Sequence, residues 1–197
     1  MKTILNEQLA DIRPVTRAMK QLSADGLESR RHYERVHCRA LLLLEPNCTE
    51  LPTVILEDTV LQPIDKVVLL MIMNIVRRTT GNAFLPTQAQ LAKMANVSSP
   101  DTIWRALLIL RCTRWLTACQ RWWCKTEFEP IAYVANAKPL PVADTLFLDP
   151  NYIECLRKCT GHAHARVRQV AGGILSQLPE VIRNRPVERP TVFGVEI

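Results

Sequence analysis

The side chains of this sequence best suited to chemistry are hydroxyl and guanidinium groups around one predicted helix, residues 99–111. Serine, threonine and arginine are residue types that contact the phosphates and base edges of DNA. Six positions remain outward once the apolar face of this helix is subtracted: Ser98, Ser99, Asp101, Thr102, Arg105 and Ile109. Arg105 could donate a bidentate pair of hydrogen bonds to O6 and N7 of guanine. The pattern indicates a helix that reads DNA from its amino end.

Positive charge is concentrated in the same part of the chain. Residues 63–125 contain nine basic and two acidic side chains, a surplus of seven, while the whole chain carries a net charge of +6. Because phosphate binding needs charge on one face, a local surplus is more informative than a basic chain as a whole. Four further basic side chains are predicted to contact the DNA backbone, two near the end of the helix and two near the tip of a following hairpin: Arg111, Arg114, Arg121 and Lys125.

Three helices are expected to position these side chains. The first begins at Pro63, where a backbone N–H is not needed, and its apolar residues recur at helical spacing up to Ile75. The second begins with a capping box, Thr87–Gln90. The third is capped by either Ser98 or Ser99. The last two helices are joined by a turn of about three residues, which is helix-turn-helix spacing.

Two predicted strands follow this helix pair. Trp115–Trp123 and Phe128–Val134 flank the polar turn Lys125–Glu127, and a helix-turn-helix followed by a hairpin is the order of a winged helix. Trp115, at the junction of helix and strand, is expected in the core. Upstream, the β-branched stretch Thr53–Leu56 is predicted to form a short strand.

We therefore predict a mainly α protein with a small β component (α+β), built around a central winged helix-turn-helix. An N-terminal extension precedes that domain, and a helical pair, Asn151–Cys159 and Ala163–Leu178, follows it. The expected divisions are a helical or extended region at 1–60, the winged helix-turn-helix at 61–149, C-terminal helices at 150–183 and a flexible tail at 184–197.

Metal chemistry and catalysis are not favoured by the sequence. Cys155, Cys159, His162 and His164 offer four metal-binding side chains within ten residues. Zinc sites, however, usually draw ligand pairs from two separated loops, and both cysteines fall on one predicted helix, where core packing is the favoured interpretation. The sequence carries no P-loop, nucleophile elbow or H-E-x-x-H motif. We expect no metal, no other cofactor and no enzymatic activity.

A cytoplasmic location is expected from the apolar segments. The longest clean apolar run, Val67–Met73, is much shorter than the ~20 residues that cross a bilayer. The first fifteen residues lack the apolar core of a secretory signal, so the seven cysteines are interpreted as reduced thiols. We predict a bacterial cytoplasmic protein without membrane contact.

Three segments carry a resemblance to a known family: "PIDKVVLLMIMNIV", "LPTQAQLAKMANVSSPDTIWRALLILRCTRWL" and "LPVADTLFLDPNYIECL". They resemble the helix-turn-helix replication proteins of pathogenicity islands and integrative conjugative elements, which are similar to winged-helix plasmid replication initiators. The resemblance covers residues 50–182, including "HARVRQVAGGILSQL". It implies a DNA-binding protein in element replication or maintenance, with the helix around Ser99–Arg111 as its reading element. One departure is Arg114, where a glycine would give an easier turn.

The function predicted from these features is sequence-specific binding of double-stranded DNA in the replication or maintenance of a mobile genetic element. Replication or conjugation proteins of the host or element are the further partners considered. Recognition of a palindrome would require a homodimer. Two alternatives stay open: a transcription regulator of the same element, and a winged-helix adaptor that binds proteins rather than DNA.

Overall fold

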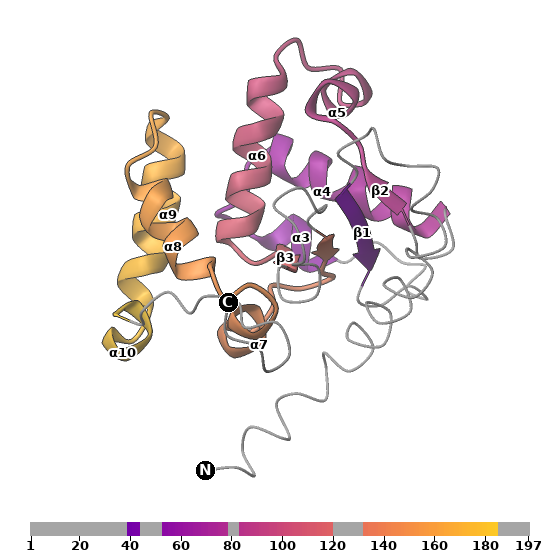
Figure 1. The fold of residues 1–197 in the computed structure, drawn as a ribbon. Coiled ribbons are helices and arrows are strands. Elements are labelled where there is room, and N and C mark those ends of the chain that lie inside the picture. Colours follow the sequence, from indigo (N-terminus) through magenta and orange to yellow (C-terminus); the bar gives the residue numbers. More distant parts are fainter. Residues whose placement is uncertain (1–38, 44–52, 79–82, 120–131, 185–197) are drawn as a thin grey trace, which may run out of the picture.

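Helices and a few short strands make up the chain in a computed structural model that describes residues 39–43, 53–78, 83–119 and 132–184 (Figure 1). The elements in chain order are β1 (Arg39–Leu43), α3 (Thr53–Glu57), α4 (Pro63–Arg78), β2 (Ala83–Leu85), α5 (Gln88–Met94), α6 (Pro100–Cys112), β3 (Leu116–Cys119), β4 (Ala132–Ala135), α7 (Val142–Leu148), α8 (Tyr152–Thr160), α9 (Ala165–Gln177) and α10 (Glu180–Arg183). The predicted fold class, mainly α with a small β component, is confirmed.

The strands form one four-stranded sheet in the order β2-β1-β4-β3. β3 and β4 pair antiparallel with Thr117 opposite Val134, so the two strands predicted to form a hairpin do pair. β1 pairs antiparallel with β2 and parallel with β4. Residues 39–43 thus lie in the middle of the sheet, which crosses the domain boundary predicted at residue 60. The predicted tail at 184–197 and the hairpin tip fall almost wholly outside the described residues.

The helix pair α5–α6 forms as its local sequence predicts. Thr87 accepts from the Gln90 backbone N–H at 3.3 Å, and the Gln90 side chain accepts from the Thr87 N–H at 2.9 Å, which completes the capping box. α5 ends where Asn96 adopts a left-handed φ of 52° and the Val97 N–H donates to the Ala92 carbonyl at 2.9 Å. Asparagine tolerates this conformation better than most residues. The turn between α5 and α6 is therefore short and well defined.

α6 is the central helix of the core. It packs against α4 and α5 on one side and against α9 and α8 on another (Figure 1). Ile103, Ala106 and Leu110 are buried, as the helical spacing predicts. Trp115, directly after α6, is fully buried, and its Nε1–H donates to Asp58 Oδ2 at 2.8 Å. The prediction that Trp115 belongs to the core is confirmed.

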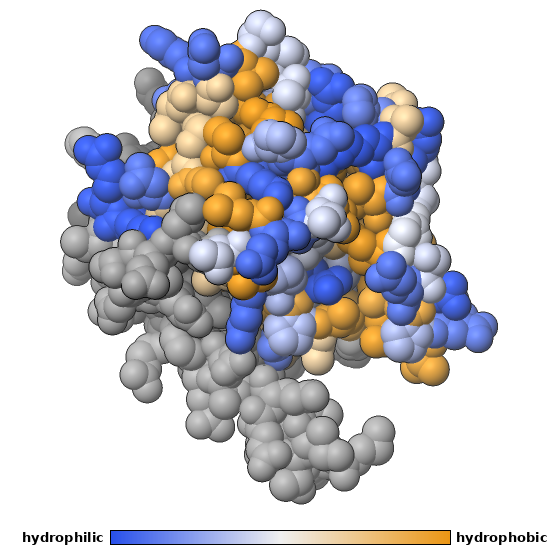
Figure 2. Space-filling view, turned by 180° about the vertical axis from the view of Figure 1, so that it is seen from behind, coloured by the Kyte–Doolittle hydropathy of each residue, from blue (hydrophilic) through white to orange (hydrophobic). Residues whose placement is uncertain are grey.

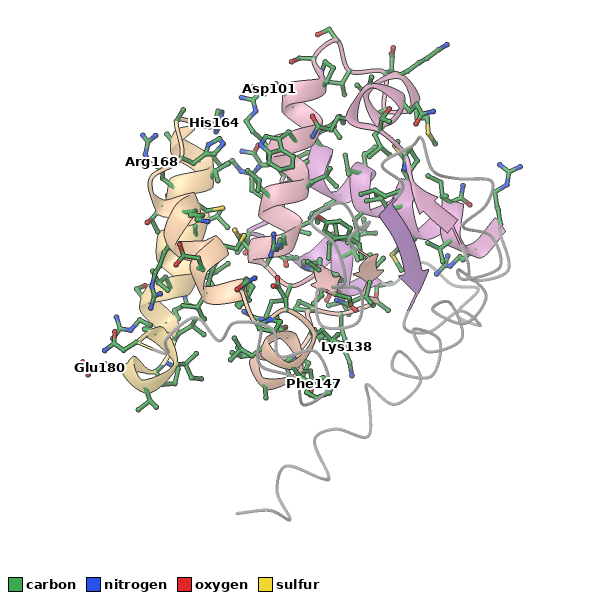
Figure 3. The ribbon with its side chains drawn as sticks, in the orientation of Figure 1. Asp101, Lys138, Phe147, His164, Arg168 and Glu180 are labelled. Atoms are coloured by element: carbon green, nitrogen blue, oxygen red, sulfur yellow. The ribbon has the colours of Figure 1, made fainter. Side chains whose placement is uncertain are left out.

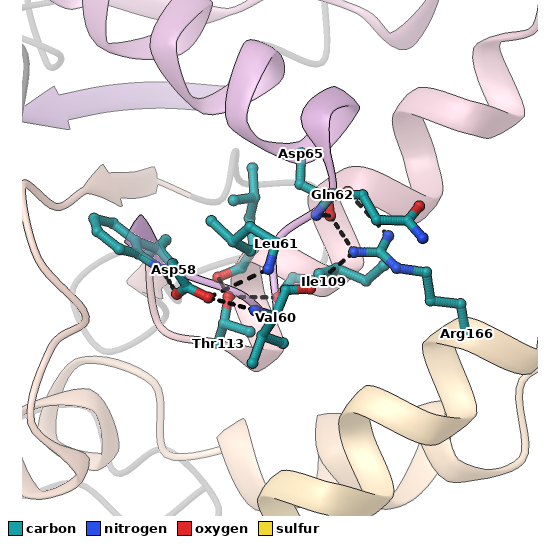
Figure 4. Close-up of polar contacts among 10 residues, drawn as sticks. Asp58, Val60, Leu61, Gln62, Asp65, Ile109, Thr113 and Arg166 are labelled. Atoms are coloured by element: carbon teal, nitrogen blue, oxygen red, sulfur yellow. Dashed lines mark hydrogen bonds and ion pairs between the residues drawn. The ribbon is translucent and has the colours of Figure 1, made fainter. Parts of the chain in front are cut away.

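A buried ion pair connects the C-terminal helices to the rest of the fold. Arg166 of α9 donates from Nη1 and Nη2 to the carboxylate of Asp65, which is fully buried in the first turn of α4 (Figure 4). Nη2 also donates to the Val60 carbonyl at 3.1 Å, and Asp65 accepts from the Gln62 N–H at 2.8 Å. α8 and α9 confirm the predicted helical pair, and they share the core with α4 and α6.

One sequence-based assignment is wrong. Thr53–Leu56 was expected as a strand, but Thr53–Glu57 forms the one-turn helix α3, in which Ile55 is the buried side chain. Its neighbours Val54 and Leu56 are about half exposed. The face opposite to the view of Figure 1 shows apolar side chains interspersed with polar ones (Figure 2). Among the described residues, no helix has the length and apolar character that a membrane span requires.

Candidate nucleic-acid interface

The amino end of α6 projects from the fold beside the α5–α6 turn (Figure 1). Ser99 is the N-cap, with its Oγ accepting from the Asp101 backbone N–H at 3.3 Å, and Pro100 is the first helical residue. Ser98 and Asp101 are exposed, and Asp101 lies at the tip of the helix (Figure 3). Of the two serines that the sequence offered as caps, the structure therefore selects Ser99.

This assignment gives a matched pair of variants. Ser99→Ala is expected to lower the free energy of unfolding by about 1 kcal/mol, because α6 loses the side-chain acceptor at its first turn. Ser98→Ala removes the neighbouring exposed hydroxyl and is expected to change stability very little. Urea denaturation of the two variants measures the difference, and equal losses would contradict the cap assignment.

Arg105 lies back along α6 toward the same end. Its Nε donates to the Asp101 carbonyl at 3.2 Å, and its Nη2 donates to Thr102 Oγ1 at 3.0 Å. Both Thr102 and Arg105 are half-buried. The structure thus brings together five of the predicted DNA-contacting residues, which we call the α6 amino end: Ser98, Ser99, Asp101, Thr102 and Arg105.

The middle of the outer face of α6 carries two apolar side chains. Trp104 and Leu108, one turn apart, are half-buried there. They border a shallow hollow of about 30 Å³, whose lining is Leu85, Trp104, Leu107, Leu108, Arg111, Leu116 and Tyr133. The sequence indicates a partly exposed Trp104, and sequence reasoning missed only its grouping with Leu108, which their i, i+4 spacing could have indicated.

Ile109 was expected to point outward, and that expectation is wrong. The side chain is 1% exposed. The outward set was obtained by subtracting one buried face, whereas α6 contacts α8 and α9 as well as α4 and α5. A helix packed on more than one side leaves a narrower outer face than an isolated helix pair would.

Arg111 is not placed to meet phosphates, which corrects the second expectation. Its Nη2 and Nε donate to Asp149 Oδ2 at 2.6 and 3.1 Å, and the Asp149 side chain is fully buried. Burial disfavours the charged guanidinium, but the Asp149 carboxylate outweighs it and holds the pKa of Arg111 above its ordinary value. Arg111 is therefore a charged link between α6 and the start of α8.

Arg114 is also turned into the fold. It adopts a left-handed φ of 65°, its Nε donates to the Leu140 carbonyl at 2.8 Å, and its Nη1 lies 3.4 Å from the Tyr152 hydroxyl. Tyr152 in turn donates to the Cys112 carbonyl at 2.6 Å, and burial raises its pKa to about 12. Arg114 thus accepts the backbone that favours glycine because its side chain bonds across the α6–β3 corner.

The remaining two predicted contacts, Arg121 and Lys125, lie outside the described residues, so the structure does not place them. The predicted interface is consequently divided. Five of the six residues predicted to face the bases lie together at the α6 amino end, and two of the four predicted to contact the DNA backbone bond within the protein instead.

The cysteines and histidines of the Cys155–His164 motif lie in different surroundings. Cys159 forms thiol hydrogen bonds with Cys112 of α6 and with Cys155. The bond with Cys112 and burial raise the pKa of Cys159 to about 11, against the lowering effect of the bond with Cys155. Protonated thiols are poor ligands and poor nucleophiles. His162 and His164 lie in the α8–α9 turn. In the part of the chain that the structure describes, no three His, Cys, Asp or Glu side chains are arranged to hold a metal ion.

Compared with protein-family models, with curated proteins and with solved structures, the chain matches none.

Proposed function

We propose that the protein binds double-stranded DNA in a sequence-specific manner through a winged helix-turn-helix centred on α5 and α6. The observation that carries this proposal is the α6 amino end. A capped helix start is held outward by a short, well-defined turn and presents Ser98, Thr102 and Arg105 together. Side chains near the amino end of a recognition helix are those that reach base edges in the major groove.

The arrangement of the neighbouring elements supports a winged helix. α5 and α6 are followed by the antiparallel pair β3–β4, which occupies the place of the wing strands. One feature sets this sheet apart, because β1 lies between β2 and β4. The proposed wing is thus the edge of a larger sheet, with β3 as its outermost strand.

The proposed backbone contacts are revised by the internal bonds of two arginines. Arg111 and Arg114 are no longer proposed as backbone contacts. The Arg111 guanidinium bonds to Asp149, and that of Arg114 bonds to Leu140 and Tyr152. Arg121 and Lys125 remain proposed contacts. Specificity then depends chiefly on Arg105, because an arginine can donate two parallel hydrogen bonds to one guanine.

Arg105 provides a charge-matched test of base reading. On the duplex recovered from a random library, Arg105→Ala is expected to weaken binding by about 1–3 kcal/mol, while random duplex loses much less. Arg105→Lys keeps the charge but lacks the guanidinium fork, so it is expected to lose most of the preference for the cognate duplex and to retain binding to random duplex. Titration of both duplexes by fluorescence anisotropy measures the two affinities. Equal losses on both duplexes would remove Arg105 as a base reader.

The biological role is proposed from the resemblance to mobile-element replication proteins. We propose replication or maintenance of such an element in the bacterial cytoplasm, with replication or conjugation proteins as further partners. An origin-dependent plasmid maintenance assay tests this role. A promoter fusion that responds to the protein while plasmid maintenance does not would favour a transcription regulator.

A second candidate function is supported by the apolar side chains in the middle of the outer face of α6. Trp104 and Leu108 are half-buried apolar side chains beside a hollow, which is the kind of surface that binds protein. On this proposal the protein is an adaptor. Failure to bind any duplex between 50 and 200 mM salt would favour it, because phosphate-driven binding strengthens steeply as the salt concentration falls.

A further inference from the structure

The amino end of α9 lies on the same side of the molecule as the α6 amino end. The two helices contact each other, and Asp101, His164 and Arg168 are found at one end of the pair (Figure 3). Val167 and Ala171 of α9 are fully buried. Together with the pairing of Arg166 with Asp65, they fix the rotation of α9 about its axis, so Arg168 is held outward in a constant position relative to α6.

Between Glu154 and Glu180, Arg168 is the basic side chain that has no ion-pair partner among the described residues. The sequence between Glu154 and Glu180 contains four basic residues and no acidic one. Arg157 and Lys158 pair with Glu154, and Arg166 pairs with Asp65. Arg168 is exposed and makes no ion pair within the described part of the chain.

The guanidinium of Arg168 is also held in place. Nη1 donates to the carbonyls of His162 and Ala163, each at 2.7 Å, which keeps the group over the α8–α9 turn. Both bonds use Nη1 alone. The N–H groups of Nη2 and Nε are therefore left to donate to an anion while the positive charge stays in place. A cation that is already ordered loses less side-chain entropy when it binds an anion.

The outer face of α9 suits an extended polyanion. Apart from Arg168, its exposed residues are small or neutral: Ala165, Gln169, Gly173, Ser176 and Gln177. A Cβ atom at Gly172 or Gly173 would meet nothing within 4 Å, so the helix surface is open there. No carboxylate on α9 would repel phosphates.

We propose that Arg168 and the α8–α9 turn contact the phosphate backbone of the same duplex whose bases the α6 amino end reads. This inference rests on the proposed function and adds a second contact to it. Phosphate contacts fix the orientation of a protein on DNA and carry no sequence information. α9 thereby supplies backbone contact in the place of Arg111 and Arg114, and it sets how α6 enters the groove.

The salt dependence of binding tests this contact. Duplex affinity of the full chain is measured between 50 and 200 mM salt for the wild type, Arg168→Ala, Arg168→Lys and Lys158→Ala. Lys158→Ala is the matched control, since it removes an equal charge that is exposed on α8 and paired with Glu154. Denaturation curves establish that all four proteins fold alike.

Arg168→Ala is expected to weaken binding equally on cognate and random duplex and to lower the slope of log affinity against log salt by about 1. Its defect is then about fourfold larger at 50 mM than at 200 mM salt. Arg168→Lys restores the slope, and Lys158→Ala leaves it unchanged. If the wild type binds duplex and Arg168→Ala has the slope of Lys158→Ala, the contact is overturned while the proposed function stands. If the wild type binds no duplex at any salt concentration, both are overturned.

Discussion

Replacing Asp65 with alanine is expected to lower the free energy of unfolding by about 3–5 kcal/mol, because Arg166 is left as a largely buried, unpaired charge. The Asp65 carboxylate is fully buried and also accepts from the Gln62 backbone N–H, so its removal leaves two sets of donors without their acceptor. Urea denaturation followed by circular dichroism measures the loss.

A double substitution distinguishes the cost of leaving a buried charge unpaired from the cost of losing the contact between α4 and α9. Asp65→Leu combined with Arg166→Met removes both charges and is expected to cost far less than Asp65→Ala, because apolar pairs often replace buried ion pairs without loss. Asp101→Ala, at an exposed position on α6, is the control for loss of a carboxylate. A cost below about 1 kcal/mol for Asp65→Ala would contradict a buried link between α4 and α9.

Trp115→Ala is the second substitution with a large expected effect. Trp115 is fully buried between α6 and β3, so truncation leaves a large cavity and is expected to cost about 3–5 kcal/mol. Trp115→Phe keeps most of the apolar volume but removes the Nε1–H that donates to Asp58, and it is expected to cost about 1–3 kcal/mol. Chemical denaturation of the two variants measures both losses of stability.

Trp104→Ala is the matched control for this prediction. Trp104 lies on the outer face of α6 and is half-buried, so its truncation leaves no enclosed cavity and is expected to cost clearly less than Trp115→Ala. Equal costs for the two tryptophans would show that the two sites do not differ in burial as the structure describes.

Features specified by neighbouring residues could be predicted from the sequence. The capping box of α5, the cap and first turn of α6, and the helical pair α8–α9 each depend on side chains within a few positions of one another. The start of α6 was therefore predicted to within one residue: the sequence left Ser98 and Ser99 open as caps, and the structure has Ser99 as the N-cap. The core position of Trp115 followed from its place at the end of an apolar helix face.

Features that depend on distant residues could not be predicted. Arg111 was expected at the surface because Asp149, its partner, lies 38 positions along the chain. Arg114 bonds to Leu140 and Tyr152 over comparable separations. The sequence likewise gave no sign that β1 inserts between β2 and β4, because pairing of this kind is decided by the whole fold.

Local propensity also failed where burial overrode it. Thr53–Leu56 is rich in β-branched residues, which favour strands, yet it forms a helical turn that buries Ile55. Ile109 was assigned outward on the assumption of one buried face, and the packing of α9 against α6 invalidated that assumption. Both errors arise from contacts that a periodicity argument does not include.

The most direct test of the central claim, that the α6 amino end reads base sequence, is selection of bound duplexes from a random library in parallel with the wild type and with Arg105→Ala. We predict that the wild type enriches a short motif, and that one guanine within it loses its enrichment in the Arg105→Ala selection. A wild-type selection that stays as random as the starting library, or an unchanged motif with Arg105→Ala, would contradict the claim.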